Sequence, residues 1–161
     1  MQNAMDSFYM ALRTRLCSLN PERTCLIRGA VRPGILVEEA EAPFSQIPSD
    51  VFVLRWTAVG ADVDLPSTLM AAQCEILYAT CGTESFGGLD RGRALNQMDE
   101  ELLTMLQPFS TPKLNYVATP PAAMLTQVFW EEPVFASVVT QRDRLSRTVS
   151  VTVYGYQEPG E

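Results

Sequence analysis

The stretch Leu69–Thr80, LMAAQCEILYAT, alternates between apolar residues and other residues along most of its length. A strand with this pattern would carry on one side Met70, Ala72, Cys74, Ile76 and Tyr78. Gln73 and Glu75 would lie on the opposite side, because successive side chains of a strand point to opposite faces. We therefore predict a β-strand here.

The preceding run at residues 51–60, VFVLRWTAVG, is rich in β-branched and aromatic residues and is apolar on both sides except at Arg55 and Thr57. This composition is typical of a strand that is covered on both faces. A connection at residues 62–67, DVDLPS, joins the two runs. Two consecutive strands joined in this way predict a long antiparallel hairpin.

Two amphipathic helices are predicted, one before the hairpin and one after it. The first covers residues 4–19 and ends at Asn20-Pro21; the second covers residues 89–107, with Asp90 as its N-cap and Pro108 after its end. Their apolar stripes are Met5, Phe8, Tyr9, Leu12, Leu16 and Leu19 in the first helix and Leu95, Met98, Leu102 and Leu106 in the second. The mid-helix acids Asp99, Glu100 and Glu101 are interpreted as a solvated face.

The remaining segments are expected to be shorter strands and loops. Extended pieces are predicted at residues 26–31 and 35–39 around a turn at Arg32-Pro33-Gly34, followed by a surface loop at 40–50. Residues 108–123 contain four prolines and predict an irregular crossing loop. Further strands are predicted at 124–130, near 134–139 and at 147–156, with a frayed tail at 157–161.

The order of these elements is helix, strands, helix, strands. It predicts an α+β fold with a mainly antiparallel β-sheet and two amphipathic helices packed on one face. No repeat or domain boundary is visible, and 161 residues match one domain, so residues 1–161 are predicted to form a single α+β domain.

The charge balance is acidic, with 19 Asp and Glu against 12 Lys and Arg and a net charge of −7. Binding to free nucleic acid draws most of its affinity from basic side chains that release counterions. An acidic chain with one lysine, Lys113, is therefore expected not to bind DNA, although its surface could let DNA slide past. No run of 18 apolar residues is present, so no membrane-spanning segment is predicted.

The chain contains no histidine. This absence removes Ser–His–Asp and Cys–His nucleophiles, nearly all catalytic zinc sites and the usual general base near neutral pH. Four cysteines, Cys17, Cys25, Cys74 and Cys81, lack the spacing of a zinc knuckle, and the first twenty residues lack the apolar core of a secretory signal. We expect reduced, buried thiols, no metal, no cofactor and no enzymatic activity.

A glycine-rich turn at residues 81–94, CGTESFGGLDRGRA, precedes the second helix. It lacks both common phosphate-binding spacings, and Asp90 would repel an anion, so Arg91 and Arg93 are the only features that favour a phosphate cradle. The structural interpretation is that the glycines allow the turn. In that case Arg91 and Arg93 pair with acids nearby or on a neighbouring subunit.

Eleven of the twelve basic residues are arginine, which is enriched at protein interfaces. The low proportion of charged residues, 19%, also favours a surface that is partly covered by a partner. Trp130 is either buried at a strand end or exposed as an interface anchor, and both alternatives stay open. The candidate interface residues are Arg91, Arg93, Phe129, Trp130 and Phe135.

The predicted layout begins with an amphipathic helix and a sheet-forming middle, and continues with a central helix, a Pro-rich crossing and a final alternating strand at 147–156. It resembles the layout of the tail terminator or tail completion proteins of long-tailed phages and related contractile injection systems. The resemblance covers most of the chain and rests on the order of elements. It implies a hexameric ring in the virion, assembled in the host cytoplasm, that caps the tail tube and meets the neck or head. It also implies tube proteins as partners, sheath proteins if the tail contracts, and DNA that passes through.

Three alternatives remain from the sequence. The first is a head–tail stopper or adaptor in the same neck. The second is a small histidine-free carboxylate hydrolase centred near Glu75, Glu84 and Asp90. The third is a monomeric adaptor or chaperone that binds one partner through Trp130 and Phe135.

Overall fold

The computed structural model describes residues 1–38, 46–64, 67–159 and 161. The elements are α1 (Gln2–Leu19), β1 (Thr24–Ile27), β2 (Ala30–Pro33), β3 (Ile35–Val37), β4 (Phe52–Asp62), β5 (Leu69–Thr80), the 3₁₀ helix η1 (Glu84–Phe86), α3 (Arg91–Met105), β6 (Ser110–Asn115), β7 (Ala122–Trp130), β8 (Val134–Phe135), β9 (Val139–Gln141) and β10 (Arg144–Tyr156). The predicted α+β fold class is confirmed.

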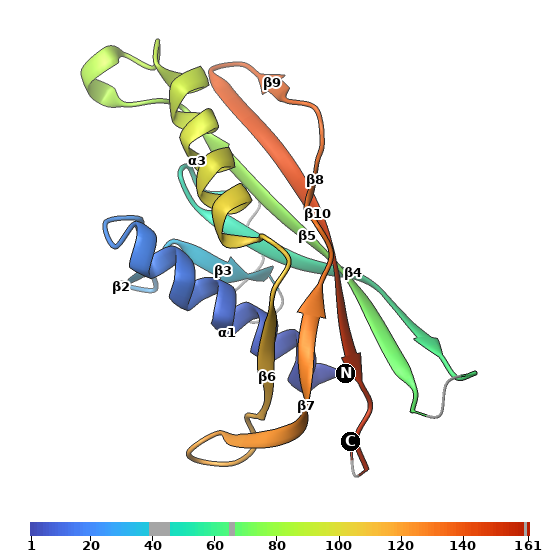
Figure 1. Cartoon of the computed structure of the whole chain (residues 1–161). Coiled ribbons are helices and arrows are strands. Elements are labelled where there is room, and N and C mark those ends of the chain that lie inside the picture. The colour runs from blue at the N-terminus through green and yellow to red at the C-terminus, as the bar shows by residue number, and fades with distance from the viewer. Residues whose placement is uncertain (39–45, 65–66, 160) are drawn as a thin grey trace.

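The main sheet has the strand order β3-β4-β5-β10-β7-β6, and β8 and β9 also pair with β10 (Figure 1). Every pair in this sheet is antiparallel except β3 with β4. β10 pairs with β5 from Leu145 to Tyr156, and β5 pairs with β4 as the predicted long hairpin. β1 and β2 form a separate two-stranded sheet.

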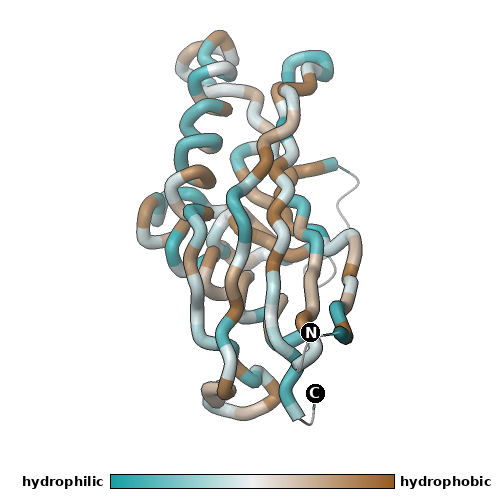
Figure 2. The backbone as a smooth tube through the Cα atoms, turned by 45° about the vertical axis from the view of Figure 1, so that its right-hand side comes forward, coloured by the Kyte–Doolittle hydropathy of each residue, from teal (hydrophilic) through white to brown (hydrophobic). Residues whose placement is uncertain are grey.

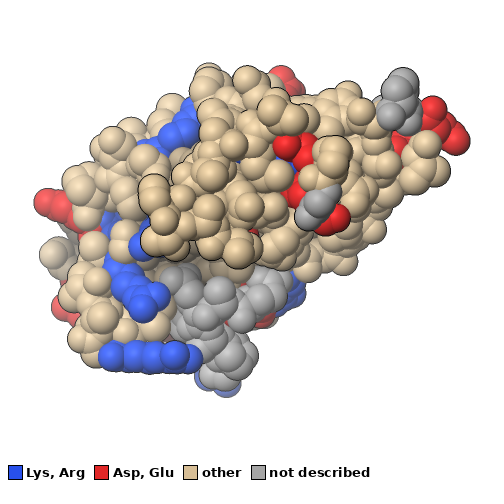
Figure 3. Space-filling model, turned by 90° about the horizontal axis from the view of Figure 1, so that it is seen from below, with Lys and Arg blue, Asp and Glu red and all other residues tan. Residues whose placement is uncertain are grey.

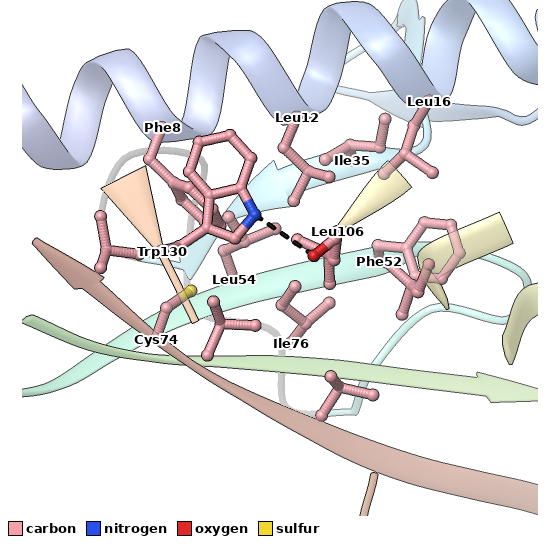
Figure 4. Packing of buried hydrophobic residues seen from close by; sticks show 14 of the residues in the cluster. Phe8, Leu12, Leu16, Ile35, Phe52, Leu54, Cys74, Ile76, Leu106 and Trp130 are labelled. Atoms are coloured by element: carbon pink, nitrogen blue, oxygen red, sulfur yellow. Dashed lines mark hydrogen bonds between the residues drawn. The ribbon is translucent and has the colours of Figure 1, made fainter. Parts of the chain in front are cut away.

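Helices α1 and α3 lie on the same face of the sheet, as predicted, and cover the main hydrophobic core (Figure 1). The predicted stripe of α3 is buried in this core, and so are Phe8, Leu12 and Leu16 of α1, whereas Leu19 of the predicted first stripe is 47% exposed. β5 contributes alternate residues, all of them buried: Ala72, Cys74, Ile76 and Tyr78. Figure 4 shows Phe8, Leu12 and Leu16 of α1 pointing onto the strands. Phe8 contacts Trp130 edge to face, with ring centroids 5.2 Å apart, and the Trp130 Nε1–H donates to the Leu106 carbonyl oxygen at 3.3 Å.

The first hairpin turns at a different place from the predicted one. The turn lies at Arg28-Gly29, between the paired residues Ile27 and Ala30, and not at 32–34. Both turn residues have positive φ, 50° and 79°, which is the backbone of a tight two-residue hairpin turn. Pro33 ends β2 instead, where a missing N–H costs little.

Strand β4 is covered on both faces only in its first part, which corrects the prediction for 51–60. Phe52 and Leu54 face the main core, and Val51 and Val53 face a second cluster with Ile27 and Leu36. The register shifts between Trp56 and Ala58, and from Thr57 onward every residue of β4 is exposed. The helices do not extend over this end of the strand (Figure 1).

The Pro-rich segment 108–123 is more regular than predicted, because it contains β6 and the start of β7. Pro112 is tolerated because β6 is the last strand in the sheet order, where one N–H can be absent. Some predictions fall on residues 39–45 and 65–66, outside the described residues. They concern Glu39, part of the 40–50 loop and the middle of the 62–67 connection.

The tail is held to the body, which corrects the prediction of fraying at 157–161. Glu158 is 8% exposed and accepts hydrogen bonds from the backbone N–H groups of Leu125 and Thr126, at 3.0 and 2.9 Å. These N–H groups lie where the register between β6 and β7 is irregular, so the carboxylate takes the place of a strand partner. Lys113 Nζ lies 2.6 Å from Glu161 Oε2 and ties the last residue down.

Candidate assembly surfaces

Asp90 closes the glycine-rich turn before α3 and occupies the predicted N-cap position of that helix. Asp90 makes no side-chain cap to α3. Its carboxylate accepts hydrogen bonds from the backbone N–H of Thr83 at 2.9 Å and from the Thr83 hydroxyl at 2.8 Å, and these bonds lower the Asp90 pKa. A Cβ on Gly82 would come within 2.6 Å of that carboxylate, so the glycine is needed for the turn to close.

A pocket of about 440 Å³ lies beside this turn. Its lining includes Arg91 but also the acids Glu84 and Asp143, which would oppose an anion. Leu89 and Phe86 in the same turn are 92% and 61% exposed. The arrangement favours the structural interpretation of the glycines over a phosphate cradle, and it presents apolar side chains at the end of the molecule.

The predicted interface residues divide between core and surface. Trp130 is 5% exposed and packs in the core, so the buried alternative holds and the anchor prediction for this residue is wrong. Phe135 is half-buried against the same core. Phe129 is half-buried and stacks on Tyr154 at 5.3 Å. Arg93 is exposed on α3, and Arg91 is half-buried beside the glycine turn.

The three acids considered for a hydrolase do not come together. Glu75 is the register partner of Arg55 in the β4–β5 ladder and lies on the sheet face opposite Cys74 and Ile76, which face the helices. The end of β5 at Thr80 lies about 17 Å further along the strand, at about 3.3 Å per residue. Glu84 and Asp90 lie beyond that end. In the described residues, no group of three Cys, Asp or Glu side chains is placed to hold a metal ion.

Buried ion pairs, which the sequence did not indicate, fix the framework. Glu101 of α3, 7% exposed, forms a two-point pair with Arg23: Arg23 Nε donates to Oε2 at 2.9 Å and Nη2 donates to Oε1 at 2.8 Å. Asp99 accepts hydrogen bonds from the Tyr78 hydroxyl and from Arg147 Nη1. The predicted solvated face of α3 is therefore wrong for Asp99 and Glu101, and only Glu100 of the three is exposed.

Lys113, the single lysine, is 1% exposed. Its Nζ donates to the Tyr156 carbonyl oxygen at 2.7 Å and lies 3.4 Å from Glu158 Oε1. Burial raises the Glu158 pKa, but hydrogen bonds from Thr126 and the neighbouring backbone, with the charge of Lys113, lower it to about 2. These contacts make the C-terminal tail part of the rigid body.

Large apolar side chains are exposed at several separate tips of the fold. Besides the glycine turn, the β6–β7 hairpin exposes Val117 and Leu125, at 92% and 91%. Figure 2 shows hydrophobic segments at the far ends of the hairpins as well as in the centre of the fold. Apolar patches that remain on a folded surface are typical of protein contact sites.

Two of these tips differ in charge. We call residues 57–64, the second half of β4 with Val63 and Asp64, the arm. It exposes Val59 and Val63, at 56% and 73%, and its only charged residues are Asp62 and Asp64. We call residues 24–33 the β1–β2 hairpin. It exposes Leu26 and Val31, both at 72%, and its charged residues are Arg28 and Arg32.

In the described part of the chain, no helix is both long enough and apolar enough to span a membrane. A scan against models of known protein families finds no match to this sequence, and a search of curated proteins finds no significant relative.

Proposed function

We propose that this protein is a structural subunit that assembles head to tail into a ring, and that the ring caps a phage or phage-like tail tube and joins it to the neck. The assembly rests on the geometry of the exposed tips. The place in a tail rests on the resemblance in the order of elements.

The exposure of the arm is the main observation that supports the proposed assembly. Half of a long strand is exposed, and its valines face solvent. Among the described residues, the strand partner of Ala58–Asp62 is β5, and no second strand of that part of the chain pairs with their outer edge. Open strand edges that carry apolar side chains are sites of pairing with another chain. A surface of this kind is better suited to a bound subunit than to an isolated one.

The total accessible surface supports the same conclusion. The chain exposes 9214 Å², whereas a compact monomer of 17.8 kDa exposes about 8,000 Å². The excess on one chain, about 1,200 Å², lies between the area of about 800 Å² that one partner buries in a standard interface and the area of about 1,600 Å² that a ring subunit would bury in two such interfaces. Assembly would cover this surface.

The chemistry of the chain agrees with a structural role. Its buried ion pairs hold helices and tail in fixed positions, which suits a building block that must present surfaces at set angles. Its net charge of −7 would keep a passing DNA from adhering to it. Among the described residues, the three acids of the hydrolase alternative, Glu75, Glu84 and Asp90, do not come together.

The placement on a tail is tested with purified tail tubes of a long-tailed phage. Negative-stain images of tubes with and without the protein should show added density at one end of each tube. Binding to isolated head connectors and not to tubes would favour the stopper or adaptor alternative. Binding to neither would contradict the proposed tail function.

A further inference from the structure

We infer that the ring closes because the arm of one copy docks on the β1–β2 hairpin of the next copy. This inference rests on the proposed function and names the two surfaces that form its subunit contact. The partner is a second copy of this chain, because the two surfaces complement one another in both apolar character and charge.

The β1–β2 hairpin has one covered face and one open face. Ile27 packs into the second hydrophobic cluster, and Cys25 packs beside it. Leu26 and Val31 are direct cross-strand partners, so their side chains stand together on the other face. Both are 72% exposed. These two large apolar side chains form an exposed apolar surface on the two-stranded sheet.

The arm has matching apolar side chains. After the register shift at Trp56, Val59 is the partner of Ala72, whose side chain lies on the core face of the sheet. The arm extends past the helices, so no helix of the described residues covers that face there. Val59 and Val63 therefore remain exposed although the strand pattern turns Val59 toward the helix side of the sheet. They would cover Leu26 and Val31 of a neighbouring copy.

The charges of the two surfaces determine that the arm contacts the β1–β2 hairpin and not a second arm. The arm has two aspartates and no basic residue, and the β1–β2 hairpin has no acidic residue and carries Arg28 exposed in its turn. Arg32 is the cross-strand partner of Cys25 and so stands on the covered face, which leaves Arg28 as the charge of the contact. One oxygen of Asp62 accepts the Asp64 backbone N–H at 3.0 Å, which places the two aspartates in one local turn. Opposite charges at an interface steer association and disfavour wrong pairings, so arm against arm and hairpin against hairpin are both opposed.

The two surfaces lie on opposite sides of the molecule. In Figure 1 the β4–β5 hairpin extends away from the helices, and β2 lies beside the far end of α1. Figure 3 shows acidic side chains at the tip to which that hairpin extends and basic side chains gathered toward the opposite side. The surfaces of one copy are therefore placed to contact two different neighbours. Repeated head-to-tail contacts of this kind form a ring when the rotation closes.

The test is a charge exchange measured by native mass spectrometry in low-salt buffer. Arg28→Asp places like charges at the contact, and aspartate tolerates the left-handed backbone of residue 28. Asp64→Arg does the same from the arm. Each variant alone should require at least about tenfold more protein to assemble than the wild type. An equal mixture should regain wild-type assembly in alternating order, because every contact then pairs opposite charges.

The matched control is Arg142→Asp. Arg142 is exposed, has φ 54° and sits in the β9–β10 turn, so the substitution changes the same charge on the same backbone conformation elsewhere. It should assemble like the wild type. For the apolar part, Leu26→Ser should weaken assembly about tenfold, whereas Leu125→Ser, at a leucine 91% exposed in the β6–β7 hairpin, should not. Circular dichroism verifies that each variant is folded.

The outcomes separate the two proposals. If the wild type assembles and Arg28→Asp, Asp64→Arg and Leu26→Ser assemble equally well, the docking inference is wrong while the ring stands. If the single charge variants are impaired and their mixture is not restored, the contact does not join these two surfaces. If the wild type is monomeric at all concentrations and also in the presence of tail tubes, the proposed function fails and the docking inference fails with it.

Discussion

Replacing Glu101 with glutamine should destabilise the fold strongly, although the change keeps the size of the side chain. Glu101 is 7% exposed and accepts hydrogen bonds from Arg23 at 2.8 and 2.9 Å and from Asn20 at 3.0 Å. Arg23 is itself 10% exposed, so the substitution leaves a buried guanidinium without its counter-charge. Breaking one side of such a pair costs about 3–5 kcal/mol in free energy of unfolding.

Glutamine retains one acceptor oxygen, so we expect the lower end of that range, about 3 kcal/mol. For a chain of this length, each kcal/mol lowers the melting temperature by about 2–4 °C, which gives a decrease of about 6–12 °C. The assay is urea denaturation together with thermal denaturation, both followed by circular dichroism. Glu100→Gln is the matched control, because Glu100 is the exposed neighbour on the same helix and should change the free energy of unfolding by less than about 0.5 kcal/mol.

A second variant separates the charge from the packing. Arg23→Met combined with Glu101→Leu removes both charges and should be less destabilised than Glu101→Gln alone, because no buried charge is left unpaired. If Glu101→Gln unfolds within about 1 kcal/mol of Glu100→Gln, the Arg23–Glu101 pair does not hold α3 to the N-terminal segment, and the reasoning is refuted.

Three further changes probe the same framework. Leu102→Ala removes a fully buried side chain from the core and should cost about 2–5 kcal/mol in urea denaturation. Lys113→Met leaves the Glu158 and Glu161 carboxylates without a buried cation and should cost about 3 kcal/mol and increase proteolysis of the tail; an intact tail would argue against the ion pairs. Because the Glu158 pKa is lowered from 4.5 to about 2 in the folded state, its stabilisation is complete above pH 4.5 and is lost as the pH falls toward 2. The stability gap between wild type and Glu158→Gln should therefore narrow over that window, and a constant gap would contradict the assignment.

The sequence predicted well those elements that are buried on one face along their whole length. Leu69–Thr80 alternates because it is a long strand with one face under the helices, and the stripe of α3 repeats because one side of the helix lies on the core. Periodicity reports such one-sided burial directly. It does not report where along an apolar strand the cover stops, so the exposed half of β4 had no distinct signal.

The errors have specific physical causes. At 28–34 two turn signals compete, Gly29 and Pro33-Gly34, and the backbone of Arg28-Gly29 forms the turn. At 108–123 four prolines suggested a loop, but an edge strand accepts Pro112. The acids of α3 and Lys113 were interpreted from their charge alone, whereas their burial depends on Arg23, Arg147 and the tail, which are distant in sequence. Of the predicted interface residues, Trp130 belongs to the core, and the arm and the β1–β2 hairpin were not singled out as contact surfaces.

The central claim is that the chain assembles into a closed ring, and the mass of the purified protein tests it most directly. Native mass spectrometry and sedimentation velocity over a wide concentration range, with tail tubes added in a parallel series, would measure it. We predict a discrete species of about 107 kDa, six times the 17.8 kDa chain, with no continuous ladder of larger species. A monomer of 17.8 kDa at every concentration, with no ring on the tubes, would contradict the account.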